Sequence, residues 1–479
     1  MESNHIELPL EIQNKISAAQ AWHYRLVPKK EDTPGAMSFY ISDQIHTSHI
    51  LNELELLFGQ TIILEKTDAD VIERTLIKYY RKHSNEDGIK QLNAASVKNN
   101  EFLTLLISEA KELGSSDIHI ETYEEKCRVR IRIDGKLIER YSIAIPDYPS
   151  LTNKIKIRAN LDIAEKRLPQ DGRIFFKNEK YRMDIRVSVL PTLHGEKIVL
   201  RLLSNDINKV DISKLGFNER QLEDYLEGIK KPHGIILISG PTGSGKTTTL
   251  YSTMKILNTE KTNIITIEDP VEYTLEGINQ VQLKEDIGLG FTEALRSFLR
   301  QDPDIIMLGE IRDAQTAQMA IRAALTGHLV LSTIHTNSAW GTVSRLTDMG
   351  VPPFLVAGTL TTSVAQRLVR LLCNKCKKTE PFNKQALPKT FIPPTDLPEH
   401  AVPKGCEHCH YTGYKGRRAI YEVISIDAEL AENIKNNAFD VEHLLKAKDI
   451  KTLKTAAFEL LQKGETSIEE VYPILLNNY

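Results

Sequence analysis

Strand-like apolar runs that alternate with helical segments dominate the second half of the chain. The runs occur at residues 235–238, 264–267, 304–308 and 329–333, and helix-like stretches follow them. Because strands covered by helices on both faces usually pair in parallel, this pattern predicts a parallel sheet in an α/β core. We place this core at residues 216–365.

The N-terminal part of the chain shows a different pattern. Residues 1–83 mix short apolar strands with helix-like runs and carry no evident chemistry, which is typical of a small adaptor domain. Residues 84–99 are polar and predict a linker. In a second domain, residues 100–203, the segment 127–133 alternates apolar and basic residues, as expected of a strand with one solvated face. The polar residues 204–215 predict a hinge linker.

A phosphate-binding motif follows the first strand of the predicted core. Residues 240–247 read Gly-Pro-Thr-Gly-Ser-Gly-Lys-Thr and fit G-x-x-x-x-G-K-[ST] directly before a helix. Its glycines let backbone N–H groups and the helix N-terminus approach a phosphate. Lys246 is expected to contact the β- and γ-phosphates, and Thr247 to bind Mg²⁺. The predicted nucleotide-binding residues are Gly240, Pro241, Thr242, Gly243, Ser244, Gly245, Lys246, Thr247 and Thr248.

The order of motifs indicates which base is bound. Many GTPases carry Asn-Lys-x-Asp for guanine after the phosphate loop. Residues 208–211 match this pattern but precede the loop. We interpret the match as accidental and expect ATP.

An apolar strand that ends in a carboxylate provides the candidate general base. Residues 304–310 read Asp-Ile-Ile-Met-Leu-Gly-Glu. Glu310 stands at the end of this strand beside Gly309, where an attacking water needs a proton acceptor. Asp304 stands at the beginning of the strand and is expected to be structural.

Four of the five cysteines form two close pairs that predict a metal site. The pairs are C-x-x-C turns separated by 29 residues, a pattern that binds one tetrahedral zinc ion through four thiolates. His408 and His410 are alternative ligands, but four thiolates complete the coordination without them. The predicted ligands are Cys373, Cys376, Cys406 and Cys409.

The surroundings of the cysteines complete the predicted organisation. A zinc-binding subdomain is expected at residues 366–420, followed by a helical region at 421–479. Cys127, the fifth cysteine, is expected to be a small apolar residue on a strand. Basic residues near the zinc site are interpreted as a solvated or partner-facing surface rather than a nucleic-acid site. They are Arg367, Arg370, Lys375, Lys377, Lys378, Lys415, Arg417 and Arg418.

Composition narrows the class of protein. A chain of 479 residues implies several domains, and 61 Lys and Arg against 64 Asp and Glu give a formal net charge of −3. This balance does not fit a protein that binds nucleic acid over its whole surface. No run approaches the roughly 20 apolar residues that cross a bilayer, and the acidic N-terminus lacks the pattern of a signal peptide. We therefore expect a cytoplasmic protein with reduced cysteines.

Six motifs occur in a fixed order along the chain. They are Ser-Ser-Asp-Ile-His-Ile-Glu (115–121), Arg-Leu-Pro-Gln-Asp-Gly-Arg (167–173), the phosphate loop, Thr-Ile-Glu-Asp-Pro-Val-Glu (266–272), Arg-Gln-Asp-Pro-Asp-Ile-Ile-Met-Leu-Gly-Glu-Ile-Arg-Asp (300–313) and Thr-Gly-His-Leu-Val-Leu-Ser-Thr-Ile-His (326–335). In this order they resemble the type II secretion and type IV pilus assembly ATPases. The chain is most similar to the type II secretion ATPase E subgroup, from about residue 102 to its end and more weakly over the first 80 residues.

This resemblance implies a multidomain α/β fold and a set of site residues. A RecA-like ATPase core would follow a PAS-like α+β domain, with the zinc subdomain inserted and a helical C-terminal region. An acidic box would lie near Mg²⁺ and the attacking water, with Glu310 as the catalytic carboxylate. Two histidines would sense the γ-phosphate or couple neighbouring strands, and four arginines would stabilise the transferring phosphoryl group across domains or subunits. In the same order, these residues are Glu268, Asp269 and Glu272; His328 and His335; and Arg186, Arg201, Arg296 and Arg300.

The resemblance also implies a function and partners. The chain would use ATP, Mg²⁺ and Zn²⁺ as a homo-oligomeric, hexameric ring that drives pseudopilus assembly and protein export in a type II secretion system. Its N-terminal domain would bind inner-membrane platform proteins, so membrane contact would be indirect, and no nucleic acid is expected. The extension ATPase of a type IV pilus is the close alternative, and a nucleic-acid translocating motor is a distant one. The complete catalytic set argues against a scaffold with a vestigial ATPase.

Overall fold

Two compact units make up the chain. One contains residues 1–88, 372–414 and 460–478, and the other contains residues 89–371, 415–459 and 479. The computed structural model describes residues 6–13, 15–16, 18–30, 36–45, 47–80, 90–92, 101–203 and 211–476.

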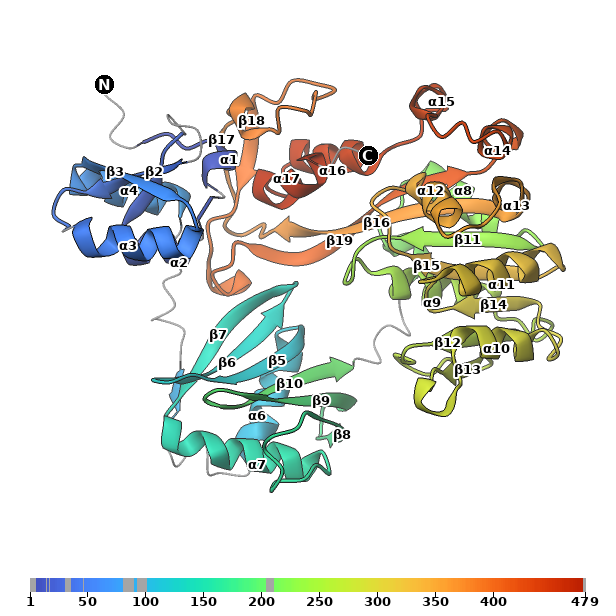
Figure 1. The fold of residues 1–479 in the computed structure, drawn as a ribbon, viewed down its shortest axis with the longest axis horizontal. Helices are drawn as coiled ribbons and strands as arrows, with labels where there is room; N and C mark the ends of the chain where they lie inside the picture. The colour runs from blue at the N-terminus through green and yellow to red at the C-terminus, as the bar shows by residue number, and fades with distance from the viewer. Residues whose placement is uncertain are drawn as a thin grey trace. The chain divides into compact units, whose positions relative to one another are not determined.

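The N-terminal part of the first unit is a three-stranded sheet with helices packed against it (Figure 1). Its elements are α1 (Leu10–Gln13), α2 (Ala18–Tyr24), β1 (Leu26–Pro28), β2 (Ala36–Ser42), α3 (Thr47–Phe58), β3 (Thr61–Thr67) and α4 (Ala69–Tyr79). In the order β1-β2-β3, β1 is antiparallel and β3 is parallel to β2. Phe39, Ile41 and Leu54 are fully buried in its core. The strands and helices predicted within residues 1–83 are thus observed.

The rest of the first unit is a cysteine-rich loop region and the C-terminal helical end. It contains β17 (Lys378–Pro381), η6 (Lys384–Ala386), β18 (Glu399–Val402), η7 (Glu407–Cys409), the last turn of α16 (Leu453–Gln462) and α17 (Ile468–Leu476). β17 and β18 pair antiparallel. Leu372, Ala401 and Tyr414 form a small hydrophobic cluster. The Tyr414 hydroxyl lies 2.7 Å from Ser467 Oγ, which joins the loop region to the segment before α17.

The first domain of the second unit is a seven-stranded sheet with two helices against one face (Figure 1). Its elements are β4 (Lys90–Leu92), α6 (Glu101–Glu112), β5 (Ser115–Thr122), β6 (Cys127–Ile133), β7 (Lys136–Ile143), η2 (Ile145–Asp147), α7 (Tyr148–Arg158), β8 (Gln170–Lys177), β9 (Arg182–Thr192) and β10 (Gly195–Leu203). The strand order is β4-β7-β6-β5-β10-β9-β8, and β4 pairs parallel with β7 while the other neighbours are antiparallel. Ile107 of α6 and Leu151 of α7 join the core.

The pattern of β6 follows the predicted alternation. Cys127, Val129 and Ile131 are buried, whereas Arg128 and Arg130 are partly exposed on the other face. The predicted solvated face and the apolar role of Cys127 are therefore confirmed.

The predicted linkers are described only in part. Residues 90–92 of the linker at 84–99 form β4, which pairs with β7. Backbone pairing does not require alternating apolar side chains, so the sequence pattern did not indicate this strand. The other linker residues lie outside the described residues, as do residues 204–210 of the predicted hinge. Residues 212–214 of that hinge form the 3₁₀ turn η4.

The second domain of this unit is a three-layered α/β fold. Its elements are η4 (Ile212–Lys214), α8 (Glu219–Ile229), β11 (Gly234–Ser239), α9 (Lys246–Leu257), β12 (Ile264–Glu268), β13 (Asn279–Gln282), η5 (Glu285–Ile287), α10 (Phe291–Phe298), β14 (Ile305–Leu308), α11 (Ala314–Leu325), β15 (Leu329–Ile334), α12 (Gly341–Asp348), α13 (Pro353–Thr359), β16 (Leu360–Leu372), β19 (Tyr414–Ser425), α14 (Ala428–Lys435) and α15 (Glu442–Ala447). The strand order is β13-β12-β14-β15-β11-β16-β19. The four strands predicted from apolar runs, β11, β12, β14 and β15, pair in parallel as expected.

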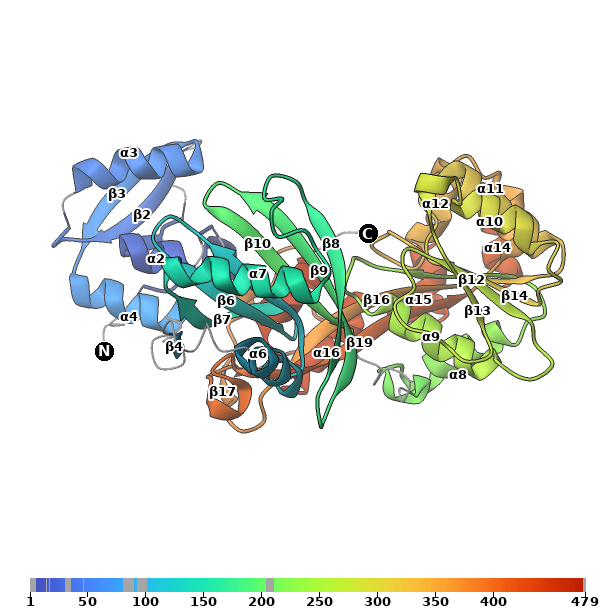
Figure 2. The ribbon, with the colours of Figure 1, turned by 90° about the horizontal axis from the view of Figure 1, so that it is seen from below.

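Helices cover both faces of this sheet. Figure 2 shows α10, α11 and α12 on one side of the strands and α8 and α9 on the other. Along β11, Ile235 and Leu237 pack in the first hydrophobic core, and Ile236 and Ile238 pack in the second. Burial on both faces explains why the strands read as continuous apolar runs. The parallel strands all end on the same side of the sheet, so the loops that follow their carboxyl ends lie close together.

The long strands β16 and β19 border the cysteine-rich loop. Residues 366–372 and 414–420, which we predicted as part of the zinc subdomain, are strand residues of the core sheet. Residues 421–425, predicted within a helical region, complete β19. Strand ends that run into a metal-binding loop carry no turn signal, so the predicted zinc subdomain extended too far into the core sheet at both ends. Among the described residues, no helix has the length and apolar character needed to cross a membrane.

Candidate functional site

The phosphate loop connects the end of β11 to the start of α9. Gly240, Gly243 and Gly245 have φ values of 149°, 80° and 91°, a region that favours glycine. The loop therefore turns sharply into the N-terminus of α9, where backbone N–H groups have no partner within the helix. Thr247 is exposed in the first turn of this helix.

The side chain of Lys246 lies over this loop. Its Nζ donates to the carbonyl oxygens of Gly240 at 2.7 Å and Pro241 at 3.1 Å. Burial lowers the pKa of Lys246, whereas the nearby Glu310 carboxylate raises it. An ammonium group, an exposed threonine hydroxyl and the N-terminus of a helix are the donors that a nucleoside triphosphate with Mg²⁺ requires. The residues present fit these two cofactors.

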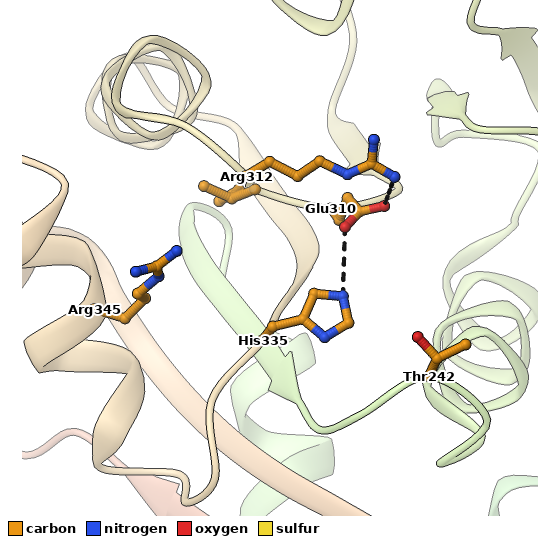
Figure 3. A pocket seen from close by; sticks show the side chains of 6 residues that line it. Thr242, Glu310, Arg312, His335 and Arg345 are labelled. Atoms are coloured by element: carbon orange, nitrogen blue, oxygen red, sulfur yellow. Dashed lines mark hydrogen bonds and ion pairs between the residues drawn. The ribbon is translucent and has the colours of Figure 1, made fainter.

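A cavity of about 500 Å³ adjoins the loop and contains the predicted catalytic carboxylate. Figure 3 shows Glu310 between Arg312 and His335. Glu310 Oε1 accepts a hydrogen bond from Arg312 at 2.5 Å, and Glu310 Oε2 lies 3.5 Å from His335 Nε2. The cavity is lined by Thr242, Glu310, Ile311, Arg312, His335 and Arg345.

The charges around Glu310 decide its protonation state. The hydrogen bond from Arg312 lowers the pKa of Glu310, burial raises it, and the charges of Arg312, His335 and Lys246 lower it further. The net direction is downward, so the carboxylate is ionised at neutral pH. It can accept a proton or orient a water molecule from its place beyond the end of β14. Asp304, at the other end of that strand, accepts from the backbone of Asn263 at 2.7 Å, as expected of a structural residue.

The three residues of the predicted acidic box have different environments. Glu268 is 4% exposed and accepts hydrogen bonds from Thr266 at 2.6 Å, from Gln280 at 3.1 Å and from Tyr251 of α9. Its side chain is thus occupied within the core.

The other two members of the box lie nearer to cations. Asp269 Oδ2 is 3.6 Å from Arg312, so it shares that guanidinium with Glu310. Glu272 Oε2 lies 3.1 Å from Arg186. The acidic box therefore connects the Glu310 site to an arginine of the preceding domain.

The two predicted histidines lie at opposite ends of β15. His335 follows the strand and reaches Glu310. His328 precedes it, where Nδ1 lies 2.8 Å from the Ala323 carbonyl oxygen. Seven residue steps at about 3.3 Å each separate the two positions by roughly 23 Å. Within one chain, this arrangement brings His335 but not His328 to the nucleotide site.

Two of the predicted arginines lie on neighbouring strands of the seven-stranded sheet. Arg186 of β9 is directly opposite Arg201 of β10. Arg186 donates to the Val271 carbonyl at 2.7 Å in addition to its ion pair with Glu272. Arg201 pairs with Asp117 at 3.0 Å instead. Only the first of this pair therefore meets the acidic box in the structure.

Of the remaining two arginines, Arg296 lies in the last turn of α10 and Arg300 follows this helix. Arg296 lies 3.9 Å from Glu293 of the same helix, and Arg300 donates to the Arg296 carbonyl at 2.9 Å. Both precede β14, so they lie toward the amino-terminal ends of the parallel strands, whereas the phosphate loop lies at the carboxyl ends. Neither lines the cavity.

The four predicted zinc ligands come together. Their Sγ atoms all lie within 4.8 Å of one another. The separations are 3.9 Å for Cys373–Cys406, 3.7 Å for Cys376–Cys409 and 3.7 Å for Cys406–Cys409. Zn–S bonds of about 2.3 Å in a tetrahedron place the sulfurs about 3.8 Å apart. The cluster thus has the dimensions of a four-thiolate zinc site.

Backbone groups support this assignment. The N–H of Gly405 points at Cys376 Sγ, and the N–H of Gly413 points at Cys409 Sγ, each at 3.3 Å. Such donors stabilise thiolates, as second-shell hydrogen bonds do around metal ligands. The donor set therefore fits zinc without a histidine.

Sequence reasoning missed three polar residues that surround the nucleotide site. Tyr251 holds Glu268, and Gln366 and Arg367 lie beneath the phosphate loop. Arg367 is 9% exposed, so our interpretation of it as part of a surface near the cysteines was wrong. Its position on a buried strand of the core sheet explains the difference. The motif that contains Glu310 also contains Arg312, and this spacing of two residues was the available signal for that partner.

Comparisons with known proteins find relatives of this chain. Residues 93–473 match the model of the family described as type II/IV secretion system protein. The chain is 50% identical over 378 residues to the type IV pilus assembly ATPase PilB of Myxococcus xanthus, which covers 77% of this chain and 66% of that protein. It is 45% identical over 393 residues to a putative type II secretion system protein E of Escherichia coli, covering 81% and 78% of the two chains. It is 39% identical over 450 residues to type II secretion system protein E of Aeromonas hydrophila, covering 88% and 89%.

Solved structures resemble the fold. The pilus retraction motor PilT with bound ADP has a TM-score of 0.53 and 27% identity, and the match covers 77% of this chain and 95% of that one. The ATPase DotB of Legionella pneumophila has a TM-score of 0.60 at 21% identity, covering 81% and 99%. The second likeness concerns the fold alone.

Proposed function

Because the chain belongs to the type II/IV secretion system protein family, we propose that it hydrolyses ATP to drive pseudopilus assembly and protein export by a type II secretion system. One observation carries this proposal. The phosphate loop with Lys246 and the ionised Glu310 lie beside the same cavity, beyond the carboxyl ends of β11 and β14, two parallel strands that both pair with β15. A site of this kind binds a triphosphate and offers an acceptor for the proton of an attacking water.

The residues of the chain divide the chemistry among them. The start of α9 and Lys246 bind the phosphates, and Thr247 would hold Mg²⁺. The metal, when bound with ATP, neutralises charge on the phosphate oxygens. Glu310 orients water and accepts its proton, while Arg312 and His335 keep the carboxylate in place. Arg312 lies next to the carboxylate and could also compensate negative charge that develops on the transferring phosphoryl group.

Hydrolysis of MgATP by the purified chain tests this function. We expect turnover in the wild type and loss of nucleotide affinity in Lys246→Ala, because the γ-phosphate then lacks its nearest cation. Unchanged binding of ATP by this variant would show that the phosphate site lies elsewhere.

A second function in the same class has a specific observation in its favour. A type IV pilus assembly ATPase is 50% identical to this chain, a higher identity than that of the type II secretion relatives described above. Deletion of the gene distinguishes the two. Loss of protein export with normal surface pili supports the secretion function, whereas loss of pili with normal export supports pilus extension.

We propose a homo-hexameric ring as the working form. The support is indirect: His328, Arg296 and Arg300 do not reach the nucleotide site within one chain. In a ring, a neighbouring subunit can supply such groups. Size measurement by light scattering, with and without an ATP analogue, tests this form.

The remaining proposals concern the flanking domains. The N-terminal domain would bind inner-membrane platform proteins, which would place a cytoplasmic chain at the membrane without a membrane span. The domain at residues 100–203 would be PAS-like, a proposal supported by its antiparallel sheet with helices on one face. The four cysteines would bind one structural zinc ion.

A further inference from the structure

Strand β16 places two consecutive buried polar residues beneath the phosphate loop. Gln366 is 2% exposed and Arg367 is 9% exposed. Gln366 Nε2 donates to the Ser244 carbonyl oxygen at 2.9 Å, and Gln366 Oε1 accepts from Thr249 Oγ1 at 2.9 Å. One side-chain amide thus joins the phosphate loop to the second turn of α9. Burial of an amide is favourable only when such bonds are made, so this geometry is strongly restrained.

The phosphate loop approaches this strand without space for a side chain. A Cβ atom at Gly240 would lie 2.5 Å from the Gln366 carbonyl oxygen, and one at Gly245 would lie 2.8 Å from Gln366 Nε2. These two glycines are therefore required by β16 as well as by a phosphate. Because the two segments are in direct contact, a displacement of β16 would displace the loop.

Arg367 connects the same strand to the loop that carries His335. Its guanidinium donates to the Gln366 carbonyl at 3.0 Å and to the Asn337 carbonyl at 2.9 Å. Asn337 follows His335 by two residues. Within the part of the chain that the structure describes, no carboxylate forms an ion pair with Arg367. Its buried guanidinium thus binds backbone carbonyl oxygens, and these charge-assisted hydrogen bonds hold the two backbone segments in place.

The loop at residues 335–340 is also held from its other side. Glu422 of β19 is 4% exposed and accepts from the Ala339 N–H at 2.8 Å. Ser239, the last residue of β11, donates its hydroxyl to the Ser338 carbonyl at 3.2 Å. The buried guanidinium of Arg367, the buried carboxyl group of Glu422 and the last residue of β11 therefore contact the consecutive residues 337–339. This places the His335 loop in a fixed register with the phosphate loop.

We propose that Gln366 and Arg367 are positioning residues of the hydrolysis site. Gln366 sets the phosphate loop in the conformation that binds nucleotide, and Arg367 sets His335 opposite Glu310. The inference rests on the proposed ATP hydrolysis, but neither side chain has to touch the reacting atoms. The two roles differ in their consequence, because one acts on binding and the other on turnover.

Separate measurement of nucleotide affinity and turnover tests this division. The dissociation constant would be measured with a fluorescent, non-hydrolysable ATP analogue, and kcat with saturating MgATP. Gln366→Ala should raise the Kd about tenfold, because loss of a restrained geometry weakens binding. Arg367→Lys keeps the charge but replaces the planar guanidinium, whose two NH₂ groups each bind one carbonyl, with a single ammonium that cannot hold both carbonyls in the same geometry, so kcat should fall at least about tenfold while the Kd changes less than about twofold.

Controls on the same domain keep the result specific. Gln318→Ala and Arg322→Lys change exposed residues of α11 and should leave Kd and kcat unchanged. Glu422→Gln replaces one of the two acceptor oxygens that bind the backbone N–H groups of Ala339 and Leu453, and it should reproduce the kcat effect of Arg367→Lys.

Three outcomes separate the possibilities. A loss of kcat in Arg367→Lys at unchanged Kd and unchanged thermal unfolding supports the proposal. Wild-type kcat in Arg367→Lys, or a parallel loss of binding, turnover and thermal stability, overturns it in favour of no role or a purely structural one. Absence of hydrolysis in the wild type contradicts the proposed function itself, and the Kd of Gln366→Ala still decides the part of the inference that concerns binding.

Discussion

Removal of two zinc ligands should unfold the cysteine-rich loop, and the adjacent histidines His408 and His410 should not replace the lost ligands. In a Cys373→Ser, Cys376→Ser double variant, two of four thiolates that lie within 4.8 Å of one another are lost. Serine hydroxyls are poor zinc ligands, because they stay protonated at neutral pH. The two remaining thiolates cannot enclose a tetrahedral ion, so the metal should be released.

The size of the effect follows from a comparison of the zinc ion with the small hydrophobic cluster at this loop. Its hydrophobic cluster consists of Leu372, Ala401 and Tyr414. Burial of these side chains contributes on the order of 5 kcal/mol. A structural zinc ion contributes about 10–16 kcal/mol in small zinc domains at neutral pH. Since the metal is the larger contribution, residues 373–413 should lose their ordered structure when it is removed.

Zinc content and protease sensitivity measure this directly. We expect about one zinc ion per wild-type chain and less than about 0.1 in the double variant, with cleavage by trypsin within residues 373–413 faster by tenfold or more. His408→Ala is the matched control and should retain the metal, since four thiolates fill the coordination sphere. Wild-type protein without zinc would refute the assignment, and loss of zinc from His408→Ala would refute the ligand set.

Two further predictions concern the nucleotide site. Arg186→Ala removes the ion pair to Glu272, so the variant should fold and bind nucleotide but hydrolyse it poorly. If the proposed ring forms, small fractions of this variant mixed into the wild type should depress activity more than in proportion, and strict proportionality would contradict coupled subunits. Arg312→Ala removes the largest influence that lowers the pKa of Glu310. Activity requires the ionised carboxylate and is lost as pH falls through its pKa, so the acid limb of the kcat profile should move to higher pH. An unmoved acid limb would show that Glu310 does not control it.

Local patterns were sufficient for much of the core. The predicted apolar runs correspond to β11, β12, β14 and β15. These strands are apolar throughout because helices cover both faces of the sheet, and a continuous apolar run is recognisable in the sequence. The position of Glu310 beyond its strand followed from the same pattern. The C-x-x-C pairs were informative because each turn brings two sulfurs together without help from distant residues.

Other features depend on contacts between distant residues and left no pattern. Gln366 and Ser244 are more than a hundred positions apart, and a buried glutamine looks the same in the sequence whether it contacts a phosphate loop or not. The two histidines show a different limit. His328 and His335 flank a six-residue strand, so their separation could have been worked out from strand geometry, whereas the motif alone suggested a common role.

The assignment of Glu310 is tested most directly by Glu310→Gln, with ATP affinity and turnover measured on the same preparation. Glutamine keeps the shape of the side chain but cannot accept the proton, so turnover should fall by at least about 100-fold while ATP affinity changes little. Glu276→Gln, an exposed change in the same domain, should behave as the wild type. Near-normal turnover in Glu310→Gln would contradict the account, because an ATPase whose base lies elsewhere does not use the site formed by Glu310, Arg312 and His335.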